Sequence, residues 1–456
     1  MGGGGAWLAG QRFRRAHLRV RSDRLFDVFL THPVLALSGG DSQYGGTMRR
    51  LSIFLALLLV AAGQLPAKSF TVLVYNVENL TGADGRTKSN DYRPARYSRS
   101  HLLTKMNNIA RVLQQFEEGR GPDIILFQEF ERDFRNENYT YDHEGMLRRY
   151  ANQTIEEMLG NPHNLEIAQM PVEALLLKTL SDRGLRGYRV AASDDAILGD
   201  NRRYITHLNV VFTRFPIGAV RTYPLPSAPA IMEVQVEIEG YPLYLFNNHW
   251  KDDAHDKGAE ALRMAGARTL RARLDEIMSV NPNADILVAG DFNCFFDQKL
   301  RFRWARTALQ DVLKVRGDEL LLRNSPTYLY NLWYELPPSR RGSELLGDSW
   351  STFMQMILSR GLYDFRGVQY VDNSFGVAAF DDLNATPEGE PIPWSFRGRG
   401  SGFSKHFPLY ARFVTVRNNR PDQYIRLPNT SFSVPELQKE RKTGNGFSFS
   451  SIVTGN

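Results

Sequence analysis

Cysteine is almost absent from this sequence, since Cys294 is the only one among 456 residues. An intramolecular disulfide is therefore excluded, and so is a Cys/His cluster of the kind that holds zinc. Cys294 closes the apolar stretch "LVAGDFNC", so we expect a buried, inert thiol. Any metal site in this chain would have to be built mainly from oxygen ligands.

Excess positive charge is missing from most of the chain as well. The net charge is +6, but residues 1–50 alone hold eight arginines against three aspartates. The other 406 residues carry 48 basic and 47 acidic side chains, a balance of +1. This composition does not indicate nucleic acid as a partner, because a nuclease usually shows a basic stripe. Arg202, Arg203 and Arg214 are candidates for a local stripe, although a solvated face is the default interpretation.

The apolar run near the N-terminus is too short to cross a membrane. Residues 52–62 form an eleven-residue run, whereas a spanning helix needs about 20. Arg49 and Arg50 precede this run and small residues follow it up to Ala67, a succession typical of secretory signal peptides. We therefore predict a signal peptide at 48–67 rather than a membrane anchor, with export to the periplasm or the outside. Residues 1–47 are predicted to be a disordered upstream extension that is not native, with Met48 as the true start.

The rest of the chain alternates strand-like and helix-like patterns. The segments "SFTVLVYNVENL", ending near Asn76, and "PDIILFQEF", ending at Glu129, predict buried strands, whereas residues 258–279 repeat apolar residues at helical spacing. The pair "IMEVQVEIEGYPLYLFNNHW" predicts an antiparallel hairpin, which favours a mixed two-sheet α/β core flanked by helices over a doubly wound parallel sheet. We assign one domain to 68–416, including a long polar insertion at 131–187, and a tail to 417–456, and we expect a monomer.

Polar side chains follow several of these predicted strands. Singly, each is more often a turn former or a structural histidine. Together, at one side of an α/β core, they indicate a site. Oxygen ligands favour a hard cation, Mg²⁺ or Mn²⁺, and such an ion beside histidines and amides suits the attack of water on a phosphoester. The side chains are Asn76, Glu129, Asn248, His249, Asp291 and Asn293.

Five motifs occur in the order "VYNVENL", "LFQEF", "NNHWKDD", "VAGDFN" and "GFSKHFPLYARF". In this order, from about Phe70 to Val416, the chain resembles the endonuclease/exonuclease/phosphatase superfamily with its deoxyribonuclease-like fold. "NNHWKDD" and the helix with Glu260 and Arg263 resemble the exported bacterial branch. The resemblance implies a four-layer α/β sandwich of two mixed β-sheets flanked by helices. It also implies an exported, metal-dependent, nuclease-like hydrolase of phosphodiester or phosphomonoester bonds.

The resemblance further implies roles for residues on both sides of the motif "GDFN". Asn76 and Glu129 would hold the Mg²⁺ or Mn²⁺ ion. Asp291 would orient or deprotonate the attacking water, and Asn293 would contact the phosphoryl oxygens. Phe292, between them, is predicted to point into the core because side chains alternate near a strand.

The histidines and two further residues complete the implied site. His249 and His406 would stabilise the negative charge that develops on the phosphoryl group. Asn248 and Lys405 are assigned to substrate binding, Lys405 because an ammonium group binds phosphate well.

Two positions beside His406 depart from the family pattern. The family has an aspartate where Lys405 stands and another where Met354 stands, and the latter orients the histidine. Three interpretations are open. Another acid fills one role, the Lys405 ammonium replaces one electrostatic function of the ion, or the chain is a catalytically impaired phosphate-binding protein of the same fold. The acids considered are Asp364, Asp381 and Asp382.

Overall fold

Successive residues of the first strand face two different hydrophobic cores. In the computed structural model of the chain, β1 (Ser69–Leu80) buries Val72 and Val74 in a core between two sheets. Leu73 and Tyr75, which alternate with them, are buried in a second core beneath helices. This period-two alternation means that the sheet is covered on both faces.

The eighth strand repeats this pattern in the second sheet. In β8 (Asp285–Asp291), Leu287 and Ala289 join the core between the sheets. Ile286 and Val288 pack instead into a third core that also contains residues of the long helix α7. Two sheets lie face to face with helices outside each, so the four-layer α/β sandwich is confirmed.

The structure describes residues 69–87, 89–132, 141–161, 163–193 and 207–416. The chain divides into two units, and all described residues belong to the second, Pro66–Asn456. The predicted signal peptide, upstream extension and C-terminal tail lie outside the described residues. Within the described part, no helix combines the length and apolarity needed to cross a membrane.

Both sheets are mixed. Neighbouring strands run parallel in the pairs β1–β2, β7–β8 and β9–β10, and antiparallel in the others. The first sheet has the order β14 (Gly367–Tyr370), β16 (Leu409–Val416), β1, β2 (Ile124–Glu131), β4 (His207–Thr213) and β3 (Arg189–Ala192), with β15 (Gly376–Val377) also beside β16. The second has the order β5 (Ile217–Leu225), β6 (Ala228–Ile238), β7 (Tyr241–His249), β8, β13 (Met354–Leu358), β10 (Leu329–Asn331) and β9 (Val315–Arg316). A separate hairpin pairs β11 (Glu344–Leu346) with β12 (Ser349–Ser351).

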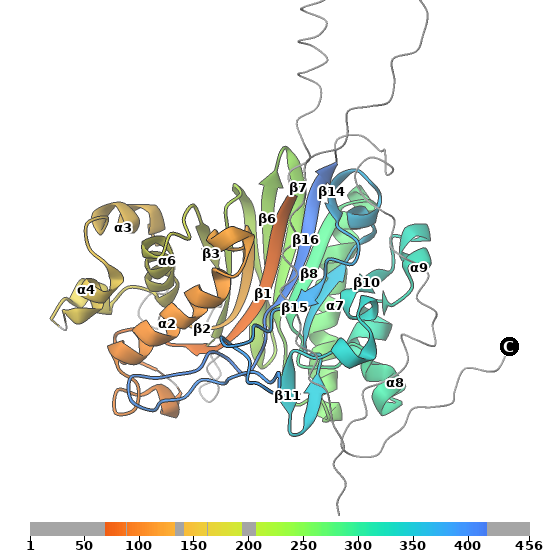
Figure 1. Cartoon of the computed structure of the whole chain (residues 1–456). Helices are drawn as coiled ribbons and strands as arrows, with labels where there is room; N and C mark the ends of the chain where they lie inside the picture. Colours follow the sequence, from red (N-terminus) through yellow and green to blue (C-terminus); the bar gives the residue numbers. More distant parts are fainter. Residues whose placement is uncertain (1–68, 88, 133–140, 162, 194–206, 417–456) are drawn as a thin grey trace, which may run out of the picture. The chain divides into compact units, whose positions relative to one another are not determined.

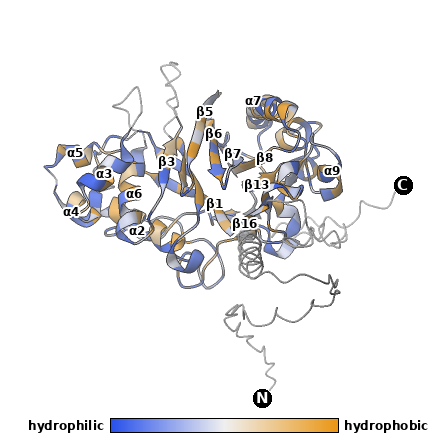
Figure 2. Cartoon of the chain, turned by 90° about the horizontal axis from the view of Figure 1, so that it is seen from above, coloured by the Kyte–Doolittle hydropathy of each residue, from blue (hydrophilic) through white to orange (hydrophobic). Residues whose placement is uncertain are grey.

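The helices form the two outer layers (Figure 1). Seen from above, α2 to α6 lie on one side of the strands and α7 and α9 on the other, with apolar colour concentrated on the strands (Figure 2). The first group is α2 (Arg99–Leu113), α3 (His143–Arg149), α4 (Ile155–Gly160), α5 (Leu165–Ala168) and α6 (Val172–Asp182). The second is α7 (Lys257–Val280), α8 (Gln298–Phe302) and α9 (Glu319–Asn324). Short helical turns are η1 (Asn90–Tyr92), η2 (Glu117–Gly119), η3 (Ala308–Val312), η4 (Leu332–Glu335), η5 (Pro338–Arg340) and η6 (Arg360–Tyr363).

Two sequence predictions need correction. The first strand does not end near Asn76 but continues to Leu80 through an irregularity in its pairing with β2. The prediction that residues 131–187 form a polar insertion is wrong for the described part of that segment. Helix α6 buries Leu175, Leu176 and Leu180 in the core beneath the helices. The short helices α3, α4 and α5, which precede this apolar stretch, concealed it in the sequence.

Candidate active site

Asn76 joins the two sheets at one edge of the sandwich. Its Nδ2 donates to Glu129 Oε1 of the first sheet at 2.8 Å and to Asp291 Oδ2 of the second sheet at 3.0 Å. All three side chains are buried. The parallel register of β7 and β8 sets His249 opposite Asp291, so the second sheet delivers both to the same level. The structure thus brings together four predicted site residues.

Asp291 is held by both carboxylate oxygens. Oδ2 accepts from Asn76, and Oδ1 accepts from the backbone N–H of Asn293 at 2.9 Å. The Asn293 side chain donates from Nδ2 to the Trp250 carbonyl at 2.9 Å. Phe292, fully buried, packs edge-on against the Trp250 ring with centroids 4.7 Å apart. The predicted inward direction of Phe292 is confirmed, and the aspartate is fixed in one orientation.

Backbone strain gathers in the same region. Four non-glycine residues at the site adopt left-handed conformations, with φ of 54° at Glu78, 60° at Asn79, 64° at Glu129 and 48° at Asn293. Such values are uncommon for residues with a side chain and cost about 1–3 kcal/mol each. Hydrogen bonds hold two of these turns, since the backbone N–H of Asn79 donates to Glu129 Oε2 at 3.0 Å and that of Glu78 donates to Asn76 Oδ1 at 3.0 Å.

His249 lies beside the glutamate with a second histidine behind it. Its Nε2 is 3.9 Å from Glu129 Oε1. The His207 ring stacks on the His249 ring at a centroid distance of 6.0 Å, and His207 Nε2 lies 2.6 Å from Asn79 Oδ1. Burial lowers the pKa of His207, although the nearby Glu129 charge opposes this shift.

His406 is held by a carboxylate from the hairpin. Its Nδ1 lies 3.0 Å from Glu344 Oε2, and both side chains are buried. Burial acts to lower the pKa of His406, but the Glu344 carboxylate and the Asp291 charge outweigh it and raise that pKa. Met354, where the resemblance expects an aspartate, is fully buried in the core between the sheets.

The structure therefore identifies which acid partners His406. Asp364 bonds its own loop, accepting from the backbone N–H of Arg366 at 2.9 Å, and is not that partner. Asp381 and Asp382 are exposed, and no bond from either to the histidine is present. The interpretation that one of these three aspartates supports His406 is wrong, and Glu344 occupies that place.

Lys405 faces several acids. Its backbone N–H donates to Glu78 Oε2 at 2.8 Å, which anchors the loop before His406 to the end of β1. Burial acts to lower the pKa of the Lys405 ammonium, but the surrounding carboxylates raise it above its usual value, and Glu129 contributes most among them. The ammonium charge therefore lies within the field of this acidic group.

Glu129 is held as a carboxylate. Its burial would raise its pKa, but the neighbouring cationic groups lower it well below the usual range. Those groups are His207, His249, His406 and Lys405. One glutamate thus experiences the charges of two predicted histidines and the predicted lysine, which places all of them around it.

At this site three histidine ring nitrogens are buried without a hydrogen bond to the described residues, namely His249 Nδ1 and both nitrogens of His406. His406 Nδ1 lies 3.0 Å from Glu344 Oε2 as an ion pair, which leaves His249 Nδ1 and His406 Nε2 with neither kind of contact. A buried polar atom without a partner is costly, by about 1–3 kcal/mol, and marks a place where a ligand or water supplies the missing bond. The site therefore presents two nitrogen atoms ready to contact an oxyanion.

Asn248 is not part of this set. Its Nδ2 donates to the carbonyls of Phe246 at 2.9 Å and Ala289 at 3.1 Å, and its Oδ1 accepts from Trp250 Nε1 at 3.0 Å. The side chain is fully buried and its polar atoms are engaged by protein. The substrate-binding role predicted for Asn248 is therefore corrected to a structural one.

Arg214 is a structural residue too. Its Nη1 donates to the carbonyls of Gly121 and Pro122, each at 2.8 Å, and its guanidinium lies over the Tyr188 ring. This arginine anchors a turn, which removes it from the candidate basic stripe. Arg202 and Arg203 lie outside the described residues.

The donor set fits a hard divalent cation. Glu129 and Asp291 both present carboxylate oxygens to the single Nδ2 of Asn76, so two anionic oxygens converge on one small region. Mg²⁺ and Mn²⁺ favour such oxygen ligands. Asn76 Oδ1 accepts from the Glu78 backbone, so the contribution of Asn76 in this structure is to hold the carboxylates together.

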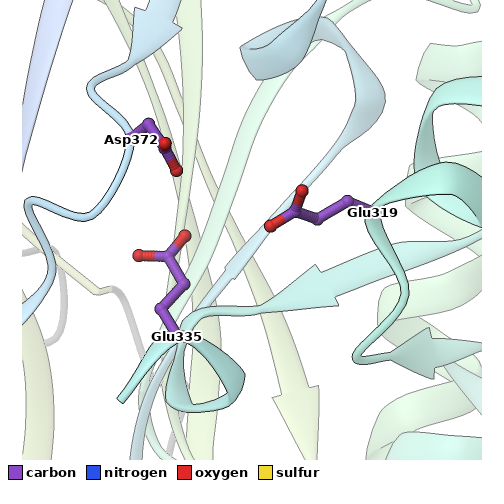
Figure 3. A group of neighbouring side chains, drawn as sticks. All are labelled: Glu319, Glu335 and Asp372. Atoms are coloured by element: carbon purple, nitrogen blue, oxygen red, sulfur yellow. The ribbon is translucent and has the colours of Figure 1, made fainter. Parts of the chain in front are cut away.

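A tighter acidic cluster lies elsewhere. Glu319, Glu335 and Asp372 bring one oxygen each within 4.8 Å of one another (Figure 3). Glu335 Oε2 accepts from the Tyr370 hydroxyl at 2.5 Å. Burial raises the pKa of Glu319 to about 7 and that of Glu335 well above its usual range. Burial thus favours the protonated form of Glu319 and Glu335 in this cluster, which lies away from the predicted site residues.

Comparison with protein families finds a match to part of the chain. The sequence pattern of the Endonuclease/Exonuclease/phosphatase family matches residues 227–415. The matched segment contains the last three of the five motifs and, with them, His249, Asp291 and His406. This match supports the endonuclease/exonuclease/phosphatase superfamily that the motif order indicated. The place of the chain in the exported bacterial branch stays a prediction.

Solved structures show limited likeness. Truncated TDP2 of Caenorhabditis elegans is 15% identical, with a TM-score of 0.40, over 76% of this chain and 98% of that one. An endonuclease/exonuclease/phosphatase family protein from Bacteroides thetaiotaomicron is 16% identical, with a TM-score of 0.41, over 77% and 99%. The 3′ phosphatase NExo from Neisseria, bound to a product DNA hairpin, is 10% identical, with a TM-score of 0.37, over 75% and 98%. No curated protein matches the sequence.

Three residues at the site were missed from the sequence: Glu78, His207 and Glu344. Glu78 stands two positions after Asn76, a spacing that was a usable signal. His207 opens β4 without any motif around it. Glu344 comes from a three-residue strand in a hairpin outside both large sheets, and no local pattern links it to His406.

Proposed function

We propose that this protein is an exported, metal-dependent phosphoesterase that hydrolyses phosphodiester or phosphomonoester bonds. The match of residues 227–415 to the Endonuclease/Exonuclease/phosphatase family supports this reaction class. The observation that carries the proposal is the grouping around Glu129 and Asp291 of two buried histidines, each with an unpartnered ring nitrogen. Anionic oxygens for a cation and nitrogen donors for an oxyanion, side by side, suit hydrolysis of a phosphate ester.

The residues divide the chemistry between them. Asp291, fixed through both oxygens, orients the attacking water and accepts its proton. Asn293 uses one N–H for the Trp250 carbonyl and keeps a second for a phosphoryl oxygen. His249 and His406 direct their unpartnered nitrogens to the developing negative charge. Lys405 adds a cation that binds the phosphate.

The carboxylates of Glu129 and Asp291, which Asn76 holds together, would hold the Mg²⁺ or Mn²⁺ ion, and the ion when bound supplies Lewis-acid stabilisation of phosphoryl oxygens. The residues of the chain position the ester and the water around that place. Nucleic acid is the leading substrate class, because endonucleases and exonucleases give the family its name. Lipid and sugar phosphates come after it.

The activity is tested on the purified protein. DNA, RNA, sphingomyelin and a generic phosphodiester are offered with Mg²⁺ or Mn²⁺, and release of product is measured before and after chelation. We expect hydrolysis of at least one substrate that chelation abolishes. Activity that survives complete chelation would contradict the metal dependence alone.

Asp291→Asn separates catalysis from folding. The substitution keeps the shape of the side chain but removes its charge, so turnover should fall by about 10²- to 10⁴-fold, the range for loss of a general base. Asp381→Asn, the same substitution at an exposed residue, is the matched control and should leave turnover unchanged. Equal turnover of the Asp291→Asn and control variants would refute the assigned role.

A catalytically impaired phosphate-binding protein is the second candidate. Lys405, in place of an expected aspartate, is the observation that favours it, because an ammonium group binds phosphate without supplying a metal ligand. Binding of inorganic phosphate by isothermal titration, together with inactivity on every ester tested, would select this function.

The proposal of export depends only on the sequence around the apolar run at residues 52–62. Mature protein recovered outside the cytoplasm should begin between about Gln64 and Phe70, with cleavage near Ala67. N-terminal sequencing decides this, and retention of the apolar run in the mature protein would overturn it.

A further inference from the structure

The Glu344 carboxylate makes the only ion pair or hydrogen bond to the His406 ring within the described residues. Its Oε2 lies 3.0 Å from His406 Nδ1. Glu344 is 5% exposed and His406 3%, so solvent does little to screen the pair. Neither ring nitrogen makes an aligned hydrogen bond to the described residues, and Nε2, which is also buried, has no ion-pair contact either. The carboxylate thus occupies one side of the ring and leaves the other side for a ligand.

The hairpin that carries Glu344 is attached to the segment after His406. The backbone N–H of Phe407 donates to the Ser343 carbonyl at 2.6 Å, and that of Ser343 donates to the Ser351 carbonyl at 2.9 Å. The Trp350 ring of β12 stacks on the Phe407 ring at 6.3 Å. These contacts flank both members of the pair, so the distance between carboxylate and ring is set by the fold.

We propose that Glu344 is the positioning residue of His406, fixing the ring so that Nε2 faces the phosphoryl group. The inference rests on the proposed function for its catalytic consequence. A carboxylate at Nδ1 holds the hydrogen on that nitrogen, which sets the tautomer and the rotation of the ring together. In the family pattern an aspartate at the position of Met354 performs this task. Here the carboxylate comes from a different element.

Glu344 acts through His406 and contacts no reacting atom, and this defines what its loss does. Removing the carboxylate frees the ring to rotate and leaves Nδ1 buried without a partner. Substrate binding depends on Lys405 and the other donors and should change little. Turnover depends on the orientation of His406 Nε2 toward the phosphoryl group, so it should fall when the ring is free to rotate.

Kinetics of three variants test the catalytic consequence. Glu344→Ala should lower kcat by about 10- to 10⁴-fold, the span seen for residues that orient a ligand or catalytic histidine, with KM within about threefold. Glu344→Gln should lose less, because its amide oxygen still accepts from Nδ1–H, and Glu344→Asp should keep most of the rate. Leu346→Ala, on an exposed residue of the same hairpin, is the control and should keep the wild-type kcat.

A spectroscopic measurement tests the contact without relying on activity. In ¹⁵N-histidine spectra of the full protein, with His406 assigned through His406→Asn, the ring should show a protonated Nδ1 in the wild type. Glu344→Ala should shift both ring nitrogens of His406, while Leu346→Ala should not. Thermal unfolding of each variant identifies any that fails to fold, and Glu344→Gln then supplies the comparison.

The two ideas fail in different ways. Unchanged His406 nitrogen shifts in Glu344→Ala would overturn the positioning role, whatever the activity. An active wild type whose kcat is retained in Glu344→Ala would overturn it as well. A wild type inactive on every ester, with the His406 shifts moving as expected, would refute the phosphoesterase and keep the positioning contact.

Discussion

At the scale of single residues, Lys405 is the position where the sequence and the family pattern disagree most sharply. Its ammonium lies in the field of Glu129, Glu344, Asp291 and Glu78. This ammonium group either binds the phosphate of the substrate, or it shows that the site no longer binds a metal ion. The geometry favours the first, because the two histidine nitrogens beside it are kept free of protein partners.

Substitution of Lys405 separates these possibilities. If the ammonium binds phosphate, Lys405→Ala should raise KM by about 10- to 100-fold, which corresponds to loss of a charged hydrogen bond of about 1.5–3 kcal/mol. Lys257→Ala, at an exposed lysine, is the control and should leave KM unchanged. An unchanged KM in Lys405→Ala, together with higher activity in Lys405→Asp, would show that the lysine reflects decay of the site.

The sequence predicted site residues that end long apolar strands and missed Glu344, which lies on a three-residue strand of a hairpin. Glu129 and Asp291 each follow an apolar run, and that run predicted a place for each of them at the end of a strand. Asn248 follows one too, yet its side chain turns into the protein, because a strand pattern does not fix the partners of an amide. Glu344 lies on a short hairpin, and its approach to His406 depends on tertiary packing that no local pattern encodes.

At the scale of elements, the parallel pair of β7 and β8 is what sets His249 beside Asp291. The two strands approach closely at Gly290, where φ is +133° and an added Cβ would lie 2.0 Å from the Asn248 carbonyl oxygen. Glycine is required there because a side chain would collide with the neighbouring backbone. The spacing between β7 and β8 at this point therefore depends on the absence of a side chain at Gly290.

Gly290→Ala should accordingly damage both stability and activity. The collision cannot be relieved by a flexible side chain, so we expect a loss of about 1–3 kcal/mol or more in the free energy of unfolding, together with lower kcat. Gly218→Ala in β5 of the same sheet is the matched control, since its nearest neighbour, the Gln235 carbonyl oxygen, is 3.5 Å from the added Cβ. Urea unfolding and kinetics of the two variants measure the difference, and equal values for both would contradict the close-approach argument.

Elements with a strong period were predictable, and elements defined by their context were not. The helix expected at 258–279 is α7, Lys257–Val280, and the expected hairpin is β6 with β7. The segment judged to be a polar insertion contains α6, which packs beneath the first sheet. Its apolar residues are so continuous that they show no helical stripe, and the polar residues of the preceding short helices dominated the composition of the segment.

At the scale of the whole molecule, buried ionisable groups shape the dependence of stability on pH. Glu319 and Glu335 have pKa values raised first by burial, that of Glu319 to about 7. The native state therefore binds more protons than the unfolded state between about pH 4.5 and 7. A state that binds more protons loses stability as pH rises, so this cluster stabilises the fold below about pH 4.5 and loses its contribution as pH rises through 7.

Other groups act in the opposite direction or in another window. Burial lowers the pKa of His143 to about 4, so its contribution rises with pH between about 4 and 6.5. The lowered pKa of Glu129 matters only below the usual range of a glutamate. The sign of the total change is thus set by several groups, and only a comparison between variants isolates the cluster.

Glu319→Gln supplies that comparison, because it keeps the shape of the side chain and cannot ionise. The free energy of unfolding of the variant, relative to wild type, should increase by on the order of 1 kcal/mol between pH 5 and pH 8, since only the wild type must lose a proton there. Glu156→Gln, at an exposed glutamate, is the control and should show no such change. Urea unfolding at the two pH values, with chelator present, measures it. A difference that stays constant or reverses would show that Glu319 is already ionised at pH 5, and burial would then not keep it protonated.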